Sequence, residues 1–410
     1  MSYRHSGRAT DDGRNLIPDH RTGIRLTVAD SVDYQDRYRG AMVGTGIGDA
    51  LGRAVEGRPP TLIRTTYGRL TDFVPWRGWV SGPKGTLTDD TEMALCLAQS
   101  FVDCRGVDPD DLASRVRAWG RVGRGMGSAT RAACRRLSDG MEWNEAGSHS
   151  AGNGAAMRAA PIGLLHPTDL DSLRETAAIA SVITHNDPTA VASAIVMAYT
   201  VAFLVHTPTG SFDQDALLAG IGAALAGVAD PALPERRDPS SMVTLGDRIR
   251  EVFAMTGRPL EEVFASTHNG AFVLESLPAA LAAFLQSPEN PEEVILAAVN
   301  GGYDADTVGA MAGAFAGAYH GASTFRTGWL SELEFRSGIE GVADDLCHLA
   351  GLGPERTEPD RPASDEYAPF IAEGKRWITT THHEAARQQP DEANDIRLMP
   401  HPTAARSLIR

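Results

Sequence analysis

The chain has 410 residues, of which 42% are hydrophobic, so it is long enough to bury a large core and to form one to three domains. Its 53 acidic residues outnumber its 38 basic residues, and the net charge of −15 disfavours undirected binding to nucleic acid or to an anionic membrane. The four cysteines show no CxxC pair, and the N-terminus carries no charged-then-apolar signal segment. We therefore expect a cytoplasmic protein in a reducing compartment.

Composition divides the chain into three segments. Residues 1–30 are polar without a clear period, and we expect a flexible leader there. Residues 31–352 carry the helical patterns and the motifs, and we expect them to fold as one domain. Residues 353–410 are mostly polar and end with several basic side chains, which is typical of a solvated C-terminal extension.

Two expected helices carry glycine at every fourth position. Gly40, Gly44, Gly48 and Gly52 share one face of a helix over 34–51, and the helix expected over 307–321 repeats that spacing. Each such glycine costs roughly 1 kcal/mol relative to alanine, so close packing must offset the loss. We therefore expect both helices to approach neighbours, or each other, very closely. These runs are too short or too interrupted by charge to span a membrane.

Helical patterns continue along the chain without a sustained period-two alternation, which indicates an all-α fold. Residues 56–83 are rich in Gly, Pro, Trp and Arg and are expected to form a long loop. Such a loop is usually functional or disordered, and Trp76 and Trp79 argue for some order. Residues 231–240 are expected to be a surface loop. The other expected helices begin at Thr88 as N-cap and then cover 109–121, 191–204, 214–228, 245–255, 260–265, 271–285, 292–300 and 331–350.

Oxygen-bearing side chains gather at two of these helix starts. One start has Thr88, Asp89 and Asp90, and the other has Asp304, Asp306 and Thr307. Either group alone is typical of helix capping. If the fold brings them together, four carboxylates would repel one another unless cations were bound, and two Mg²⁺ or Mn²⁺ ions suit such ligands. No cluster of Cys and His supports a softer metal.

Three further segments have the chemistry to contact a phosphate or a sugar. Residues 123–130 (GRGMGSAT) are typical of a glycine-rich turn that leads into a helix, where free N–H groups attract a phosphate, although by themselves they more often form a plain turn. Ser150 and Asn153 lie among small residues and can hydrogen-bond a ligand. His185 precedes the helix start at Asp187, and it either caps the preceding helix or contacts a ligand.

Taken together, five motifs resemble those of the ADP-ribosylglycohydrolases. They are GDALGRAVE at 48–56, TDDT at 88–91, GNGAAMR at 152–158, TH with a following proline at 184–188, and AVN through DADTVG at 298–309. The resemblance runs from about residue 36 to 322. It implies a compact multi-helix domain with a central binuclear Mg²⁺ or Mn²⁺ site. The implied reaction is hydrolysis of the α-glycosidic bond between ADP-ribose and an acceptor such as arginine or serine, which releases free ADP-ribose.

The resemblance also implies a role for individual residues. The metal ligands fall on the six residues of the two helix starts, and the mobile acid or base falls on Glu56, which could otherwise be a mere surface charge. An aromatic position beside Ser150 is Ala151 here, so Trp143 is considered as the adenine-stacking side chain. Arg158 is a possible source of positive charge in the pocket. The diphosphate and ribose contacts fall on Gly125, Gly127, Ser128, Ser150, Gly152, Asn153 and His185.

Two other functions are compatible with the same residues. A catalytically inactive relative would bind ADP-ribose or serve a structural role, and a metal-dependent phosphatase or nucleotide hydrolase would use the same carboxylates. All six metal positions and Glu56 are present, which favours the hydrolase. The expected partner is an ADP-ribosylated protein or other acceptor, with no membrane and no undirected nucleic acid, and the expected state is a monomer.

Overall fold

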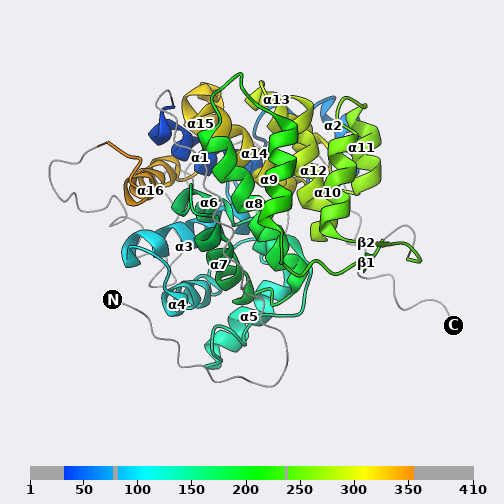
Figure 1. The fold of residues 1–410 in the computed structure, drawn as a ribbon. Helices are drawn as coiled ribbons and strands as arrows, with labels where there is room; N and C mark the ends of the chain where they lie inside the picture. Colours follow the sequence, from blue (N-terminus) through cyan, green and yellow to red (C-terminus); the bar gives the residue numbers. More distant parts are fainter. Residues whose placement is uncertain (1–31, 77–81, 236–238, 355–410) are drawn as a thin grey trace.

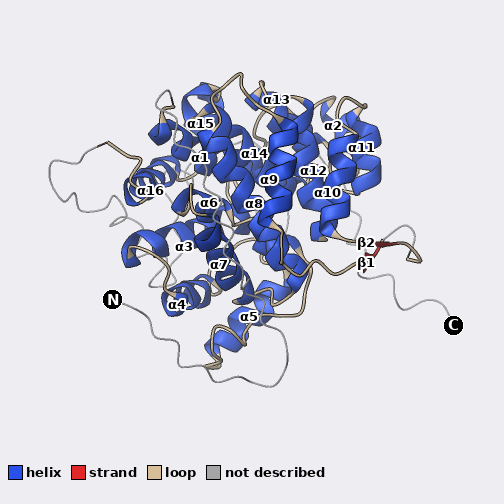
Figure 2. Cartoon of the chain, viewed as in Figure 1, coloured by secondary structure: helices blue, strands red, loops and turns tan. Residues whose placement is uncertain are grey.

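Helices account for most of the computed structural model, which describes residues 32–76, 82–235 and 239–354 (Figures 1 and 2). The leader over 1–30, Trp79 and nearly all of the C-terminal extension lie outside the described residues. In chain order the helices are α1 (Tyr34–Arg53), α2 (Pro60–Tyr67), α3 (Asp89–Cys104), α4 (Pro109–Trp119), α5 (Ser128–Ser138), α6 (Ala160–Leu165), α7 (Leu170–Val182), α8 (Pro188–His206), α9 (Gln214–Ala224), α10 (Leu245–Ala254), α11 (Leu260–Thr267), α12 (Val273–Gln286), α13 (Pro291–Asn300), α14 (Ala305–His320), α15 (Thr327–Glu332) and α16 (Arg336–Leu349). The prediction of an all-α fold is confirmed.

Two sequence-based expectations about the elements were wrong. The loop predicted over 56–83 contains α2, which begins at Pro60, where the fixed φ of proline suits a first helical position, and which buries Ile63. The single helix predicted over 331–350 is two helices, α15 and α16. Phe335 separates them with a φ of 64°, in the left-handed region that ends a regular helix.

The loop expected over 231–240 is closed by a short antiparallel pair, β1 (Leu233–Pro234) and β2 (Met242–Val243). Short 3-10 turns also occur at Asn153–Ala155 and Ala322–Thr324. The hairpin stands out from the helical body near α10 (Figure 2).

The two helices with four-residue glycine spacing pack directly against each other. A methyl group added to any of four residues of α1 would overlap a backbone carbonyl oxygen of α14, since Gly40 faces Gly317, Gly44 faces Gly313, Gly48 faces Gly309 and Gly52 faces Ala305. The helices are antiparallel, because the numbers rise along α1 as they fall along α14. The end of α1 therefore lies beside the start of α14, which carries the second group of acidic residues.

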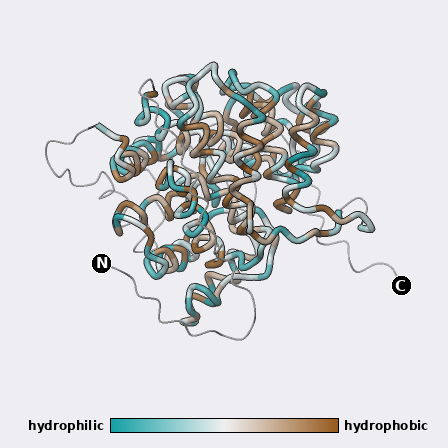
Figure 3. Tube along the Cα trace, viewed as in Figure 1, coloured by the Kyte–Doolittle hydropathy of each residue, from teal (hydrophilic) through white to brown (hydrophobic). Residues whose placement is uncertain are grey.

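The helix α8 is the centre of the remaining packing. It is long and apolar enough to cross a membrane by length and composition, but 89% of its most apolar window is buried inside the domain. It packs against α6, α7, α9, α12 and α14, so we assign it to the core. Figure 3 shows that hydrophobic residues concentrate on such interior helices, whereas hydrophilic residues dominate the outer ones.

Candidate functional site

At the start of α14, three carboxylates lie next to one another. Oxygen atoms of Glu56, Asp304 and Asp306 are all within 4.8 Å of each other. Asp304 stands at the N-cap position, and its carboxylate accepts a hydrogen bond of 2.5 Å from the side-chain amide of Asn153. Arg53 forms an ion pair with Glu56, and its Nη1 lies 3.5 Å from Oδ2 of Asp306. The positive charge of the Arg53 guanidinium therefore lies against this group of three carboxylates.

The start of α3 is held by a carboxylate from α1. Asp49 is fully buried and accepts hydrogen bonds from the Thr88 hydroxyl at 2.7 Å, the Thr88 backbone N–H at 2.9 Å and the Thr91 hydroxyl at 2.5 Å. Thr88 occupies the predicted N-cap position but makes no capping bond with its side chain. Asp49 does this instead. Asp49 was not among the predicted site residues, although a single acid in the glycine-spaced helix over 34–51 was an available signal.

The carboxylates of the two helix starts interact electrostatically. Burial raises the pKa of Asp90 well above its usual range, and Asp306 from the other start raises it further. Burial and then Asp306 raise the pKa of Asp304 to about 7, and burial and then Glu56 raise the pKa of Asp306. Each carboxylate thus disfavours the charge on the others.

The donor set fits divalent cations. It consists of carboxylate and hydroxyl oxygens, and Oδ1 of Asp90 is buried with no hydrogen-bond partner among the described residues. Hard cations such as Mg²⁺ and Mn²⁺ take ligands of this type. The tightest acidic group in the described residues contains two of the six predicted ligands, Asp304 and Asp306, together with Glu56. Asp89 and Asp90 interact electrostatically with Asp306, and the role of all six residues as ligands stays a prediction.

The glycine-rich turn of residues 123–127 lies against the start of α3. Gly125 has a φ of 78°, and a Cβ atom added to it would come within 2.5 Å of Oδ1 of Asp89. Arg124 fixes the turn, since its Nε donates to Glu92 at 2.7 Å and its guanidinium pairs with Glu334 at 2.8 Å. The turn predicted here is confirmed as the lead into α5.

The first turn of α5 keeps N–H groups available for an anion. Gly127 is its N-cap residue and Ser128 its first residue, both exposed, and no side chain among the described residues caps this helix. The partial positive charge of the helix start therefore faces solvent beside Asp89. Phosphate binding by Gly125, Gly127 and Ser128 remains a prediction that this geometry supports.

Asn153, from the segment around Ser150 that was predicted to contact a ligand, reaches Asp304 at the start of α14. The amide of Asn153 donates to Ser276 as well as to Asp304, so in this structure it orients a predicted metal ligand. Ser150 accepts a bond of 3.2 Å from the backbone N–H of Gly152, which shapes the loop. His185 pairs with Ser148 in an isolated β-bridge and is buried, with 3% of its surface exposed.

Phe272 is an aromatic residue that the sequence analysis did not single out. An antiparallel bridge pairs it with Gly152, and the backbone N–H of Val273 donates to the carbonyl of Ala151. Trp143, the earlier candidate for stacking, packs against the hydrophobic core and is half-buried. No local sequence pattern marks Phe272 as a site residue, because it is the bridge with Gly152 that places it beside this loop.

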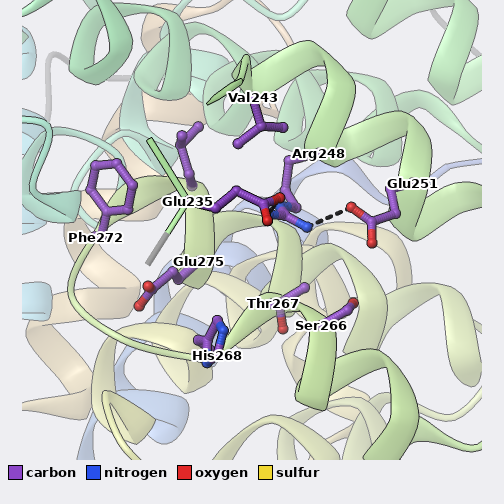
Figure 4. A pocket seen from close by; sticks show the side chains of 10 residues that line it. Glu235, Val243, Arg248, Glu251, Ser266, Thr267, His268, Phe272 and Glu275 are labelled. Carbon is purple, nitrogen blue, oxygen red and sulfur yellow. Dashed lines mark hydrogen bonds and ion pairs between the residues drawn. The ribbon is translucent and has the colours of Figure 1, made fainter. Parts of the chain in front are cut away.

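Phe272 also lines a cavity of about 190 Å³ between the hairpin and α10, α11 and α12. Figure 4 shows Arg248 reaching Glu251 on one side of this cavity, with Phe272 and Glu275 on the other. Arg248 also pairs with Glu235 at 2.5 Å, so its positive charge offsets part of the negative charge of the two glutamates on this side of the cavity. Phe272 thus places an aromatic side chain beside the 150–153 loop and at a partly open cavity, a setting that suits a flat nucleobase.

The chain matches a known protein family over most of its length. The model of the ADP-ribosylglycohydrolase family matches residues 30–355. The chain belongs to this family. Its helical architecture and the order of its motifs agree with membership, so the resemblance identified from the sequence is confirmed, and at this level the chain is a glycohydrolase of ADP-ribosyl groups.

Named members of the family cover most of the chain. A glycohydrolase of ADP-ribosyl-dinitrogen reductase from Rhodospirillum rubrum is 30% identical over 324 residues, which are 77% of this chain and 97% of that protein. The ADP-ribosylarginine hydrolase Tri1 of Serratia proteamaculans is 28% identical over 77% of this chain and 80% of its own length. A solved structure described as an ADP-ribosylglycohydrolase-related protein complex is 32% identical, with a TM-score of 0.60 over 78% of this chain and 99% of its own.

Proposed function

We propose that this family member is a metal-dependent ADP-ribosyl hydrolase that cleaves the α-glycosidic bond between ADP-ribose and an acceptor and releases free ADP-ribose. The observation that carries the proposal is the convergence of Glu56, Asp304 and Asp306, with oxygens within 4.8 Å of one another. Asp89, which interacts electrostatically with Glu56 and Asp306, lies against the turn that leads into the uncapped start of α5. One site thus combines groups for a diphosphate with groups for a glycosidic bond.

The metal part of the proposal assigns Thr88, Asp89 and Asp90 from one helix start and Asp304, Asp306 and Thr307 from the other as ligands of two Mg²⁺ or Mn²⁺ ions. Such ions would supply positive charge for the ribose hydroxyls and would make a bound water more acidic. The buried Oδ1 of Asp90, which has no partner in the described residues, supports this assignment.

The diphosphate requires local positive potential in a protein whose net charge is −15. The uncapped start of α5 supplies N–H donors at Gly127 and Ser128, and Gly125 brings the turn close to Asp89. Backbone donors do not alter the net charge, so they solve this problem without basic side chains. On the other side, Phe272 offers the face on which the adenine would stack.

Glu56 is the proposed general base. It is exposed beside Asp304 and Asp306, and Arg53, stacked 4.1 Å over the ring of Trp76, holds it by an ion pair. A water molecule attacks the anomeric carbon and gives its proton to Glu56. The bond between this carbon and the acceptor breaks, and its electron pair leaves with the acceptor atom. The acceptor atom then takes a proton, for which the protonated Glu56 is the proposed source.

The proposed substrates are ADP-ribosylated protein side chains such as arginine or serine, with another acceptor as the alternative. The name of the Serratia relative, which specifies ADP-ribosylarginine, supports an arginine linkage as the first to test. We further propose a monomeric cytoplasmic enzyme, and the absence of disulfides within the described residues supports a reducing compartment.

The test is release of free ADP-ribose from arginine-, serine- and nucleic-acid-linked substrates with Mg²⁺, Mn²⁺ or EDTA. The expected result is metal-dependent release that Asp304→Ala abolishes. Release of inorganic phosphate instead of ADP-ribose would identify a phosphatase or nucleotide hydrolase. Tight ADP-ribose binding with no release from any substrate would identify an inactive binding protein and overturn the proposed activity.

A further inference from the structure

A buried arginine without an ion-pair partner lies behind the 150–154 loop. Arg158 has 1% of its surface exposed, and no carboxylate of the described residues is within ion-pair distance of it. Its Nη2 donates to the carbonyl of Ala180 at 2.8 Å and to the hydroxyl of Thr184 at 2.7 Å, while Nε has no partner there. Burial lowers the pKa of Arg158 to about 10, so the group keeps its charge near neutral pH.

This arrangement is expensive for the fold. Burying an unpaired cation costs several kcal/mol even after relaxation, on the order of what a domain can lose through one substitution. Arg158 is also too buried to line the pocket directly, as the sequence analysis had considered. Its hydrogen bonds lead instead to Thr184, which is fully buried and adjoins His185.

The Thr184 hydroxyl determines the state of the His185 ring. A hydroxyl has one hydrogen to donate, and Arg158, which donates to Oγ1 of Thr184, has no acceptor that could take this hydrogen. The remaining hydrogen-bond partner of this oxygen in the described residues is Nδ1 of His185, at 2.8 Å. Nδ1 is then the acceptor, and a neutral imidazole must carry its hydrogen on Nε2. Burial, followed by the charge of Arg158, lowers the pKa of His185 to about 3, so the ring is neutral near pH 7.

The other ring nitrogen faces the loop predicted to contact substrate. Nε2 of His185 lies 3.4 Å from the position that a Cβ atom on Gly152 would occupy, and Cε1 lies 2.5 Å from that position on Gly154. Within the described residues Nε2 has no hydrogen-bond partner, so its donor is available to a ligand. The two glycines leave the space in which the ring is held.

We propose that Arg158 and Thr184 are positioning residues that hold His185 as a fixed Nε2–H donor directed at the 152–154 loop, where it binds an anionic or hydroxyl oxygen of the substrate. The tautomer is inferred from where the Thr184 hydroxyl hydrogen can go, and this inference does not depend on the proposed function. The identity of the oxygen, a diphosphate or ribose oxygen of an ADP-ribosyl group, rests on the proposed function.

The first test measures the tautomer by long-range proton–nitrogen NMR on protein with labelled histidines, in the absence of ligand. His185→Gln assigns the His185 signals among the 12 histidines. The expected result is the Nε2–H tautomer in the unsubstituted protein and in Thr184→Ser, with loss of the single tautomer in Thr184→Val and in Arg158→Met. An Nδ1–H tautomer in the unsubstituted protein, or unchanged His185 signals in Thr184→Val, would overturn the proposal.

A second histidine–threonine pair, which is partly buried, supplies the matched control. Thr176 lies 2.8 Å from Nε2 of His166, with no arginine in that contact. Thr176→Val should change the His166 signals and leave those of His185 unaltered. If Thr176→Val disturbed His185 as much as Thr184→Val does, the effect would be a general loosening of the core and the proposal would fail.

Calorimetric titration with ADP-ribose then tests the ligand contact. Thr184→Val should weaken binding by about tenfold, as expected for one hydrogen bond to a charged acceptor, and Thr184→Ser should restore it. Equal affinity in Thr184→Val would remove the substrate contact from the proposal. If the unsubstituted protein does not bind ADP-ribose, the proposed function fails, whereas the tautomer measurement still decides the positioning role.

Discussion

The start of α3 and the start of α14 carry the same side-chain types but are held in different ways. The start of α3 is fixed by hydrogen bonds from Thr88 and Thr91 to Asp49, which is fully buried. The start of α14 is fixed by backbone contact, because Gly52 of α1 lies directly against Ala305. Its carboxylates have the exposed Glu56 as neighbour.

Because of this difference, we expect the two halves of the site to respond differently to substitution. Hydrogen bonds are lost one at a time, so the α3 side should weaken gradually. Close backbone packing has no room to relax, so a single added carbon in the α1–α14 contact should act on the whole domain. The following substitutions test this distinction.

The largest effect is expected from Gly48→Ala, whose methyl group would overlap the carbonyl of Gly309. Despite the better helix propensity of alanine, we expect a loss of about 3 kcal/mol or more in the free energy of unfolding, measured by urea denaturation. Gly222→Ala on α9 is the matched control, since a Cβ atom there meets nothing within 4 Å. It should stabilise by up to about 1 kcal/mol. Equal stability of both variants would contradict the packing argument.

Removing one proposed ligand from either helix start should strongly weaken metal binding. Asp304→Ala and Asp90→Ala should each weaken Mn²⁺ binding, measured by calorimetry, by more than roughly 100-fold, the upper end found for outer-shell partners. Asp110→Asn, at an exposed position of α4, is the control for a lost acidic charge. If Asp304→Ala kept full affinity while Asp90→Ala lost it, only the α3 side would hold metal.

Glu56→Gln should separate chemistry from metal binding on the α14 side. The loss of a general base is expected to lower kcat by about 10²–10⁴-fold. Mn²⁺ affinity should change by less than about tenfold, which is smaller than the roughly 10–100-fold loss expected when a residue that orients a metal ligand is removed. A loss of affinity as large as that of Asp304→Ala would instead identify Glu56 as a metal ligand.

The smallest effect is expected from Asp49→Asn on the α3 side. The amide N–H₂ of asparagine would face hydrogen-bond donors of Thr88 and Thr91, which now point at carboxylate oxygens. We expect Mn²⁺ affinity to fall by about 10–100-fold, as for other residues that orient ligands. Asp33→Asn is the control, because asparagine caps α1 as well as aspartate does. Unchanged affinity in Asp49→Asn would show that Asp49 does not orient the site.

Local patterns were sufficient for most of the helices and for the two acidic helix starts. Capping residues and apolar spacing act over a few neighbouring residues, so the sequence contains them directly. The errors have a different origin. Nothing local specifies that Phe335 adopts a positive φ between α15 and α16, and the Gly- and Pro-rich composition around α2 obscured a helix with one buried side chain.

By itself the sequence determined the helical class, the four-residue glycine spacing, the two acidic helix starts and the family motifs, because each is a pattern within one segment. Tertiary structure alone decided that α1 and α14 are partners, that Asp49 caps α3 and that Phe272 pairs with Gly152. It also decided the link from Arg158 through Thr184 to His185. These contacts join residues distant in the chain, and their energies depend on burial and orientation, which no local pattern encodes.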